Sequence, residues 1–126
     1  MATTRSQSPA AGLMVSRDLF FSSKVTGTAA QWGLSVELEG DVSQAIAKLA
    51  GHSYRCLILD LGTPGLSVSE MMATLPVENR PRVIAFDAHV RIAHLDAARA
   101  AGCDEVLPRS RFSAELPGIL KRALDV

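Results

Sequence analysis

Residues 56–65 read Cys-Leu-Ile-Leu-Asp-Leu-Gly-Thr-Pro-Gly and carry the strongest structural signal of the chain. Four apolar side chains in a row followed by an aspartate predict a short strand covered on both faces, as in the centre of a parallel sheet. Gly62, Pro64 and Gly65 then indicate a turn. We therefore expect Asp60 at the carboxyl end of a central strand.

Similar segments alternate along the rest of the chain. Strands are predicted at residues 13–15, 34–39, 56–59, 83–86 and 106–107, and helices at 19–32, from Asp41 through 49, 67–75, 90–101 and 113–124. Apolar and polar residues alternate in 34–39, which is typical of an edge strand. Phe20 and Trp32 are interpreted as helix core. Strict alternation predicts an α/β fold, a doubly wound (βα)5 parallel sheet of the flavodoxin-like order 2-1-3-4-5.

Length and composition set the broad class. The 126 residues suit one domain, expected at 12–126, after a Thr/Ser/Gln/Pro-rich stretch at 1–11 that predicts a disordered tail. Thirteen basic residues balance thirteen acidic ones, so no global field attracts nucleic acid or an anionic membrane. The sequence shows no signal peptide and no apolar run of membrane-spanning length. The two cysteines lack metal-ligand spacing. These features predict a cytoplasmic protein.

Ligands of open parallel sheets bind at the carboxyl ends of the strands. The residues that follow the predicted strands there include Ser16, Arg17, Asp60, Asp87 and Arg109. No Ser-His-Asp order, Gly-rich phosphate loop or His/Cys cluster is found, so the sequence predicts no enzyme. The three histidines, at positions 52, 89 and 94, are interpreted as solvated surface residues.

Two segments resemble a known family. Residues 57–65 are similar to the phosphoacceptor strand and loop of receiver domains in two-component response regulators. Residues 102–109 resemble the family's last strand, with Arg109 where the family has lysine. The order of elements matches from residue 12 to residue 124, which is nearly the whole chain.

The resemblance implies a phosphoacceptor at Asp60 and a degraded site around it. In the family, an acidic pair after the first strand helps to bind Mg²⁺, and a hydroxyl residue ends the fourth strand. Here the acidic pair is replaced by Ser16 and Arg17, and the hydroxyl by Asp87. Arg17 and Arg109 are expected to neutralise the two carboxylates in a salt-bridged cluster without an ion. We therefore expect no cofactor, weak or absent Mg²⁺ binding, and weak or absent phosphorylation.

The resulting hypothesis is a stand-alone pseudo-receiver, a signalling module that acts by protein–protein interaction. Its expected partner is a histidine kinase, a downstream signalling protein or a second copy. The resemblance places the contact on the face made by the fourth helix, fifth strand and fifth helix, including Ile92, Leu95 and Ala98. Neither nucleic acid nor membrane is an expected partner.

Two alternatives stay open from the sequence. One is a working response regulator in a phosphorelay, phosphorylated on Asp60 through a shifted register in which Asp18 joins the acidic pair. The other is a flavodoxin-like module that binds a small anionic ligand between Arg17 and Arg109.

Overall fold

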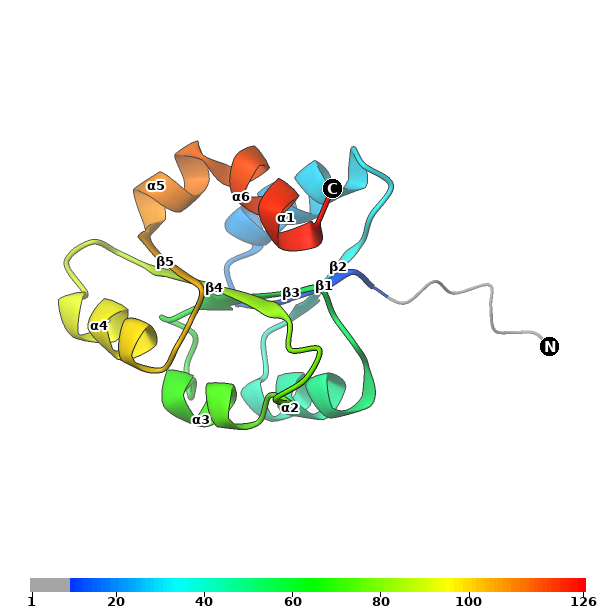
Figure 1. Cartoon of the computed structure of the whole chain (residues 1–126). Coiled ribbons are helices and arrows are strands. Elements are labelled where there is room, and N and C mark those ends of the chain that lie inside the picture. The colour runs from blue at the N-terminus through cyan, green and yellow to red at the C-terminus, as the bar shows by residue number, and fades with distance from the viewer. Residues whose placement is uncertain (1–9) are drawn as a thin grey trace.

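The computed structural model describes residues 10–126 and contains alternating strands and helices (Figure 1). The strands are β1 (Gly12–Val15), β2 (Val36–Glu39), β3 (Cys56–Asp60), β4 (Arg82–Asp87) and β5 (Glu105–Pro108). The helices are α1 (Leu19–Ala30), α2 (Val42–Gly51), α3 (Val68–Ala73), α4 (Ile92–Ala100), α5 (Arg109–Ala114) and α6 (Leu116–Leu124). Of the predicted tail, residues 1–9 lie outside the described residues. Ala11, which was assigned to it, donates its N–H to the Ser35 carbonyl.

The five strands form one parallel sheet in the order β2-β1-β3-β4-β5, which confirms the predicted fold and strand order. Helices α1, α5 and α6 cover one face, and α2, α3 and α4 cover the other (Figure 1). Within residues 10–126, no helix combines the length and the apolar character needed to cross a bilayer.

The central position of β3 follows from its uninterrupted apolar run. Ile58 packs into the core under α1, α5 and α6, whereas Leu57 and Leu59 pack into the core on the opposite face. Neighbouring side chains of a strand point to opposite faces, and helices cover both faces of the sheet, so all three side chains are fully buried. Burying both faces fixes the strand in the centre, and Asp60 is thereby carried to the carboxyl edge.

Short polar side chains start three of the helices. Asp18, Asp41 and Ser67 accept hydrogen bonds from the first free N–H groups of α1, α2 and α3, respectively. After α1, Gly33 adopts a φ of 72°, a left-handed conformation that is typical of a glycine at the end of a helix.

Two local predictions were wrong. The segment 113–124 was predicted as one helix, but the structure has two. Helix α5 begins directly after β5, and the helical conformation is interrupted at Glu115, ahead of Pro117 in the first turn of α6. Phe20 is 68% exposed rather than in the core, and the Lys24 ammonium lies 4.7 Å from its ring centroid. Trp32 is partly buried and packs against the core, as expected.

Candidate functional site at the carboxyl edge of the sheet

Asp60 ends β3 and is buried, with 7% of its surface exposed. One carboxylate oxygen accepts a hydrogen bond of 2.8 Å from the Ser16 hydroxyl, and the other accepts one of 3.1 Å from the Gly62 N–H. No ion pair to Asp60 is found among residues 10–126. Dipoles rather than a cation therefore satisfy this carboxylate.

Ser16 reaches Asp60 because of the sheet register. Val15 pairs with Leu59 across β1 and β3, so the next residues of the two strands lie side by side. The serine is 1% exposed, and its oxygen also accepts a 3.0 Å hydrogen bond from the Asp18 N–H. Both the donor and the acceptor capacity of this hydroxyl are used, so its orientation is fixed.

Arg17 points away from the crevice, and the prediction that it faces the two carboxylates was wrong. Its Nε donates to the Gly40 carbonyl at 3.1 Å, and its Cγ lies 3.1 Å from the position of a Cβ built on Gly40. The physical reason is the alternation of side chains at the end of a strand: Ser16 points inward, so Arg17 points out.

The Asp18 carboxylate caps α1. It accepts hydrogen bonds of 3.0 and 3.1 Å from the N–H groups of Phe20 and Phe21. The structure thus places Asp18 at the first turn of a helix, where a carboxylate is stabilised by the free N–H groups. The shifted register, in which Asp18 joins an acidic pair beside Asp60, requires this cap to be given up.

Asp87 ends β4 and is brought next to Asp60, as predicted from the strand ends. A Cβ built on Gly62 would lie 3.4 Å from an oxygen of Asp60 and 3.9 Å from an oxygen of Asp87. Asp87 is 3% exposed and accepts a 2.8 Å hydrogen bond from the Ala88 N–H. The two buried carboxylates therefore share the crevice on either side of Gly62.

His94 is the main side-chain partner of Asp87, a contact that the sequence did not predict, although the histidine is exposed as expected. Its Nδ1 lies 2.7 Å from Asp87 Oδ2, although 45% of its side chain is exposed. The contact joins the first turn of α4 to the end of β4. Nothing in the local pattern signals it, because the pairing depends on how residues 88–91 fold back.

Arg109 places a guanidinium near Asp87, as predicted. Asp87 pairs with Pro108 in the sheet, so Arg109 follows one position beyond, with its Nη2 3.8 Å from Asp87 Oδ1. The guanidinium lies 5.8 Å from the Phe21 ring centroid. Its buried Nε has no hydrogen-bond partner among the described residues, and 38% of its side chain is exposed.

Phe21, Phe86 and Phe112 hold this corner in place. Phe86 and Phe112 stack with centroids 4.4 Å apart, and Phe21 lies 5.6 Å from Phe86. Aromatic pairs of this kind stabilise a fold beyond their buried area. The cluster ties α1, β4 and α5 together directly beneath Arg109.

Comparisons with known proteins place this geometry in context. Searches against protein-family models and against curated proteins give no match. Among solved structures, a response-regulator receiver domain from Bermanella marisrubri superposes with a TM-score of 0.76 at 21% identity, over 90% of this chain and 96% of that one. The chain has the receiver fold.

Further receiver domains agree with this assignment of the fold. A receiver domain from Methanospirillum hungatei gives a TM-score of 0.77 at 17% identity, over 94% of this chain and 95% of the other. The receiver domain of a sensor histidine kinase from Pseudomonas aeruginosa gives 0.73 at 23% identity, over 91% and 97%. The latter is described with a magnesium ion coordinated in its active-site cleft.

The crevice of this receiver fold offers a magnesium ion few free oxygen ligands. Mg²⁺ requires several oxygen ligands in octahedral geometry, usually including carboxylates. Within residues 10–126, no three His, Cys, Asp or Glu side chains are placed to share a metal ion. The Ser16 hydroxyl points its proton at Asp60, and Asp87 is engaged by His94, so the donors of this receiver crevice are already paired.

Cysteine chemistry is also disfavoured in this receiver fold. Burial raises the pKa of the Cys56 thiol to about 12 and that of Cys103 to about 11. Because only the thiolate is strongly nucleophilic, both side chains are unreactive at neutral pH.

Proposed function

We propose that this chain is a signalling module of the receiver type that acts by protein–protein interaction and is phosphorylated weakly or not at all on Asp60. The observation that carries the proposal is the 2.8 Å hydrogen bond from the buried Ser16 hydroxyl to Asp60. A neutral donor stands at the strand end where the resemblance leads one to expect a carboxylate.

The charges in the crevice disfavour phosphoryl transfer. The transferred group is negatively charged, and enzymes stabilise it with cations and well-placed donors. Here the buried Asp87 carboxylate lies beside Asp60 instead of a neutral hydroxyl, and its Oδ1 is only 3.9 Å from the built Gly62 Cβ. Arg109 is drawn toward Asp87, so the cation needed by an incoming phosphoryl group is partly neutralised.

The same contacts favour a single conformation. Asp87 on β4 binds His94 on α4 at 2.7 Å and Arg109 on α5 at 3.8 Å. Removing one partner of a buried charge leaves it uncompensated, so such contacts resist rearrangement. We infer that these side chains hold the start of α4 in place without a covalent switch.

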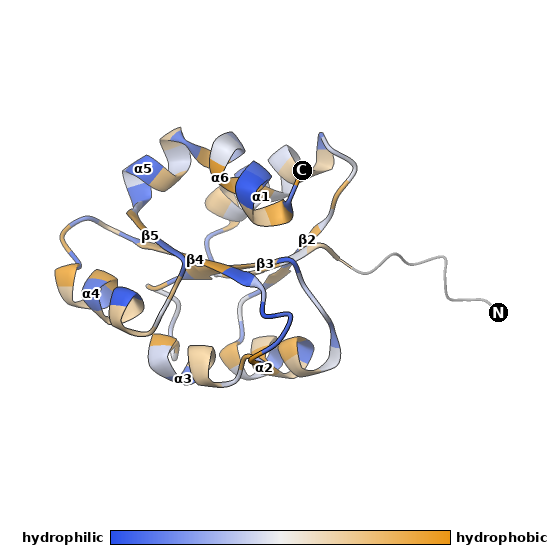
Figure 2. Ribbon diagram, viewed as in Figure 1, coloured by the Kyte–Doolittle hydropathy of each residue, from blue (hydrophilic) through white to orange (hydrophobic). Residues whose placement is uncertain are grey.

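The start of α4 is our candidate contact for a protein partner, a histidine kinase, a downstream signalling protein or a second copy. Val90 and Ile92 are 69% and 64% exposed, and Figure 2 shows a hydrophobic tip at this end of α4. Leu95 and Ala98, which were expected on the contact face, are buried, with only 6% and 0% of their surface exposed. Both side chains point toward the sheet. Of the residues expected on the contact face, Ile92 is the one that remains exposed.

Phosphorylation by acetyl phosphate tests the proposal. The protein is incubated with acetyl phosphate and Mg²⁺, and the intact mass is measured for addition of one phosphoryl group. The control is a variant with an acidic pair, a hydroxyl and a lysine restored by Ser16→Asp, Arg17→Asp, Asp87→Thr and Arg109→Lys. We expect labelling of this control and little or none of the wild type.

The contrary result is equally clear. Mg²⁺-dependent labelling of the wild type to the level of the control, abolished by Asp60→Asn, identifies a working receiver and overturns the proposal. If the control melts cooperatively but is not labelled, the four substituted positions do not explain the absence of labelling. That result removes the basis of the proposal.

A further inference from the structure

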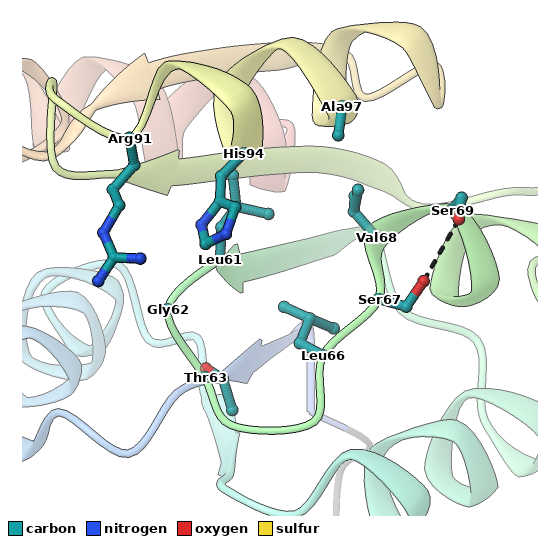
Figure 3. Close-up of a pocket in the computed structure, with 10 residues that line it drawn as sticks. All are labelled: Leu61, Gly62, Thr63, Leu66, Ser67, Val68, Ser69, Arg91, His94 and Ala97. Carbon is teal, nitrogen blue, oxygen red and sulfur yellow. Dashed lines mark hydrogen bonds between the residues drawn. The ribbon is translucent and has the colours of Figure 1, made fainter.

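A pocket of about 370 Å³ lies between residues 61–69 and the side of α4 that carries His94 and Ala97. Figure 3 shows Arg91 and His94 projecting from the start of α4 toward the loop that carries Gly62 and Thr63. The volume falls within the range of sites for small organic ligands, which is roughly 300–1,000 Å³. The pocket is adjacent to the carboxylate crevice but separate from the Ser16–Asp60 hydrogen bond.

The lining of this pocket is basic at one end. Among residues 10–126, Arg91 and His94 are the only ionisable side chains that line it, and none of the lining residues is acidic. Arg91 forms no ion pair with any residue of the described part of the chain. A guanidinium beside an imidazole, without a carboxylate in the lining, favours an anionic group in the ligand.

The remainder of the lining is apolar or weakly polar. Leu61, Leu66 and Val68 present aliphatic surface, and Figure 3 shows Leu66 across the pocket from Arg91 and His94. Ser67 and Ser69 lie at one side, with their hydroxyl oxygens 3.3 Å apart. Such a site accommodates an apolar body with a charged end rather than a fully polar molecule.

We propose that this pocket binds a small organic monocarboxylate, with its carboxylate at Arg91 and its apolar part against Leu66. A monoanion is preferred over a phosphate ester because of the buried carboxylates of Asp60 and Asp87 around Gly62, which is itself part of the lining. The more highly charged phosphate meets stronger repulsion from them. The site is not the one considered from sequence, because Arg17 points toward Gly40.

Binding at this pocket involves the contact that positions α4. His94 lines the pocket and at the same time binds Asp87 through Nδ1. A ligand carboxylate that hydrogen-bonds to the imidazole from the pocket side competes with Asp87 for this side chain. The ligand thus acts on the same histidine that holds α4 to the end of β4.

Nuclear magnetic resonance of the ¹⁵N-labelled full chain tests the inference, with 4-phenylbutyrate as the probe. We expect saturable shifts at the amides of residues 61–69 and 91–97. The uncharged 4-phenylbutyramide is expected to bind about five-fold more weakly, as for the loss of one charge-assisted contact. Phenyl phosphate is also expected to bind more weakly, because Asp60 and Asp87 repel its larger charge. Arg91→Gln should weaken 4-phenylbutyrate by a similar factor. Arg99→Gln, an exposed change farther along α4, should leave it unaltered.

Several results overturn the inference. These are the absence of shifts in the two segments at the highest soluble concentration, equal binding of the neutral amide, and equal binding by Arg91→Gln. Tighter binding of phenyl phosphate refutes the choice of a monocarboxylate. None of these outcomes depends on whether Asp60 accepts a phosphoryl group, so the two proposals fail separately.

Discussion

Replacing Ser16 by alanine should destabilise the domain, because its hydroxyl is the main partner of a buried carboxylate. In the variant Asp60 keeps only the Gly62 N–H, and the Asp18 N–H loses its acceptor. The change removes a single oxygen from a side chain that is 1% exposed. The loss of stability therefore reports the hydrogen bonds rather than repacking of the core.

The magnitude follows from the two lost contacts. A hydrogen bond to a charged group contributes about 1.5–3 kcal/mol, and a neutral one about 1 kcal/mol. Some of the loss is recovered if water reaches Asp60, which is 7% exposed. We expect a fall of about 2–3 kcal/mol in the free energy of unfolding, or roughly 10 °C in Tm for a domain of this size.

Urea melts of wild type, Ser16→Ala, Asp60→Asn and the double variant measure this directly. The matched control is Ser43→Ala, since Ser43 donates to Asp41 at 2.6 Å, in a similar serine–aspartate pair that is exposed to solvent. We expect a much smaller effect there. A Ser16→Ala variant within about 0.5 kcal/mol of wild type behaves like a surface substitution and refutes the assigned role of the hydrogen bond.

Two further variants test ion pairs. Arg109→Ala should cost about 1–2 kcal/mol in urea melts, less than the loss of a fully buried pair, because the distance to Asp87 is 3.8 Å and 38% of the arginine is exposed. A loss above about 3 kcal/mol would show that this weak-pair reading is wrong. Lys48→Met should destabilise the domain at neutral pH, since hydrogen bonds from Lys48 lower the pKa of Glu37 and Glu39 below 4.5. These depressed pKa values add stability above pH 4.5 that is lost as pH falls through the folded-state values, so the two melting curves should converge in acid. A difference that persists unchanged in acid would exclude this origin.

The fold could be predicted from the sequence because the patterns that indicate its strands and helices are local. The run at 56–59 is apolar at every position, and residues 34–39 alternate, which separates a central strand from an edge strand. Glycines and short polar caps mark where helices end and begin. Phe20 was misassigned because Leu19, Phe20 and Phe21 are all apolar, so periodicity does not say which of them faces the core.

The site could be predicted from the sequence only in part. Asp60 and Asp87 follow adjacent strands, and the rule for strand ends brings them together. The direction of Arg17 depends on which residue after β1 first points into the crevice. A shift of one residue reverses that direction, and the sequence does not specify it. His94 pairs with Asp87 through a loop whose path no sequence pattern specifies.

The two buried carboxylates at the edge of the sheet are satisfied in different ways, and this difference connects the two proposals. Asp60 is held by a hydroxyl and an amide, both fixed by the strands β1 and β3. Asp87 is held by side chains from α4 and α5, and both are partly exposed. The partners of Asp87 are therefore the ones that a molecule from solution can reach.

The start of α4 is thus anchored to Asp87 by a contact that a ligand can reach. His94 binds Asp87 on one side and lines the pocket on the other, and the exposed Val90 and Ile92 lie at the same end of the helix. A ligand influences partner binding only if it interacts differently with the two states of such an element. A carboxylate that draws His94 away from Asp87 meets this condition, because it stabilises the pocket while weakening the anchor. The chemistry of Asp60 takes no part in that coupling.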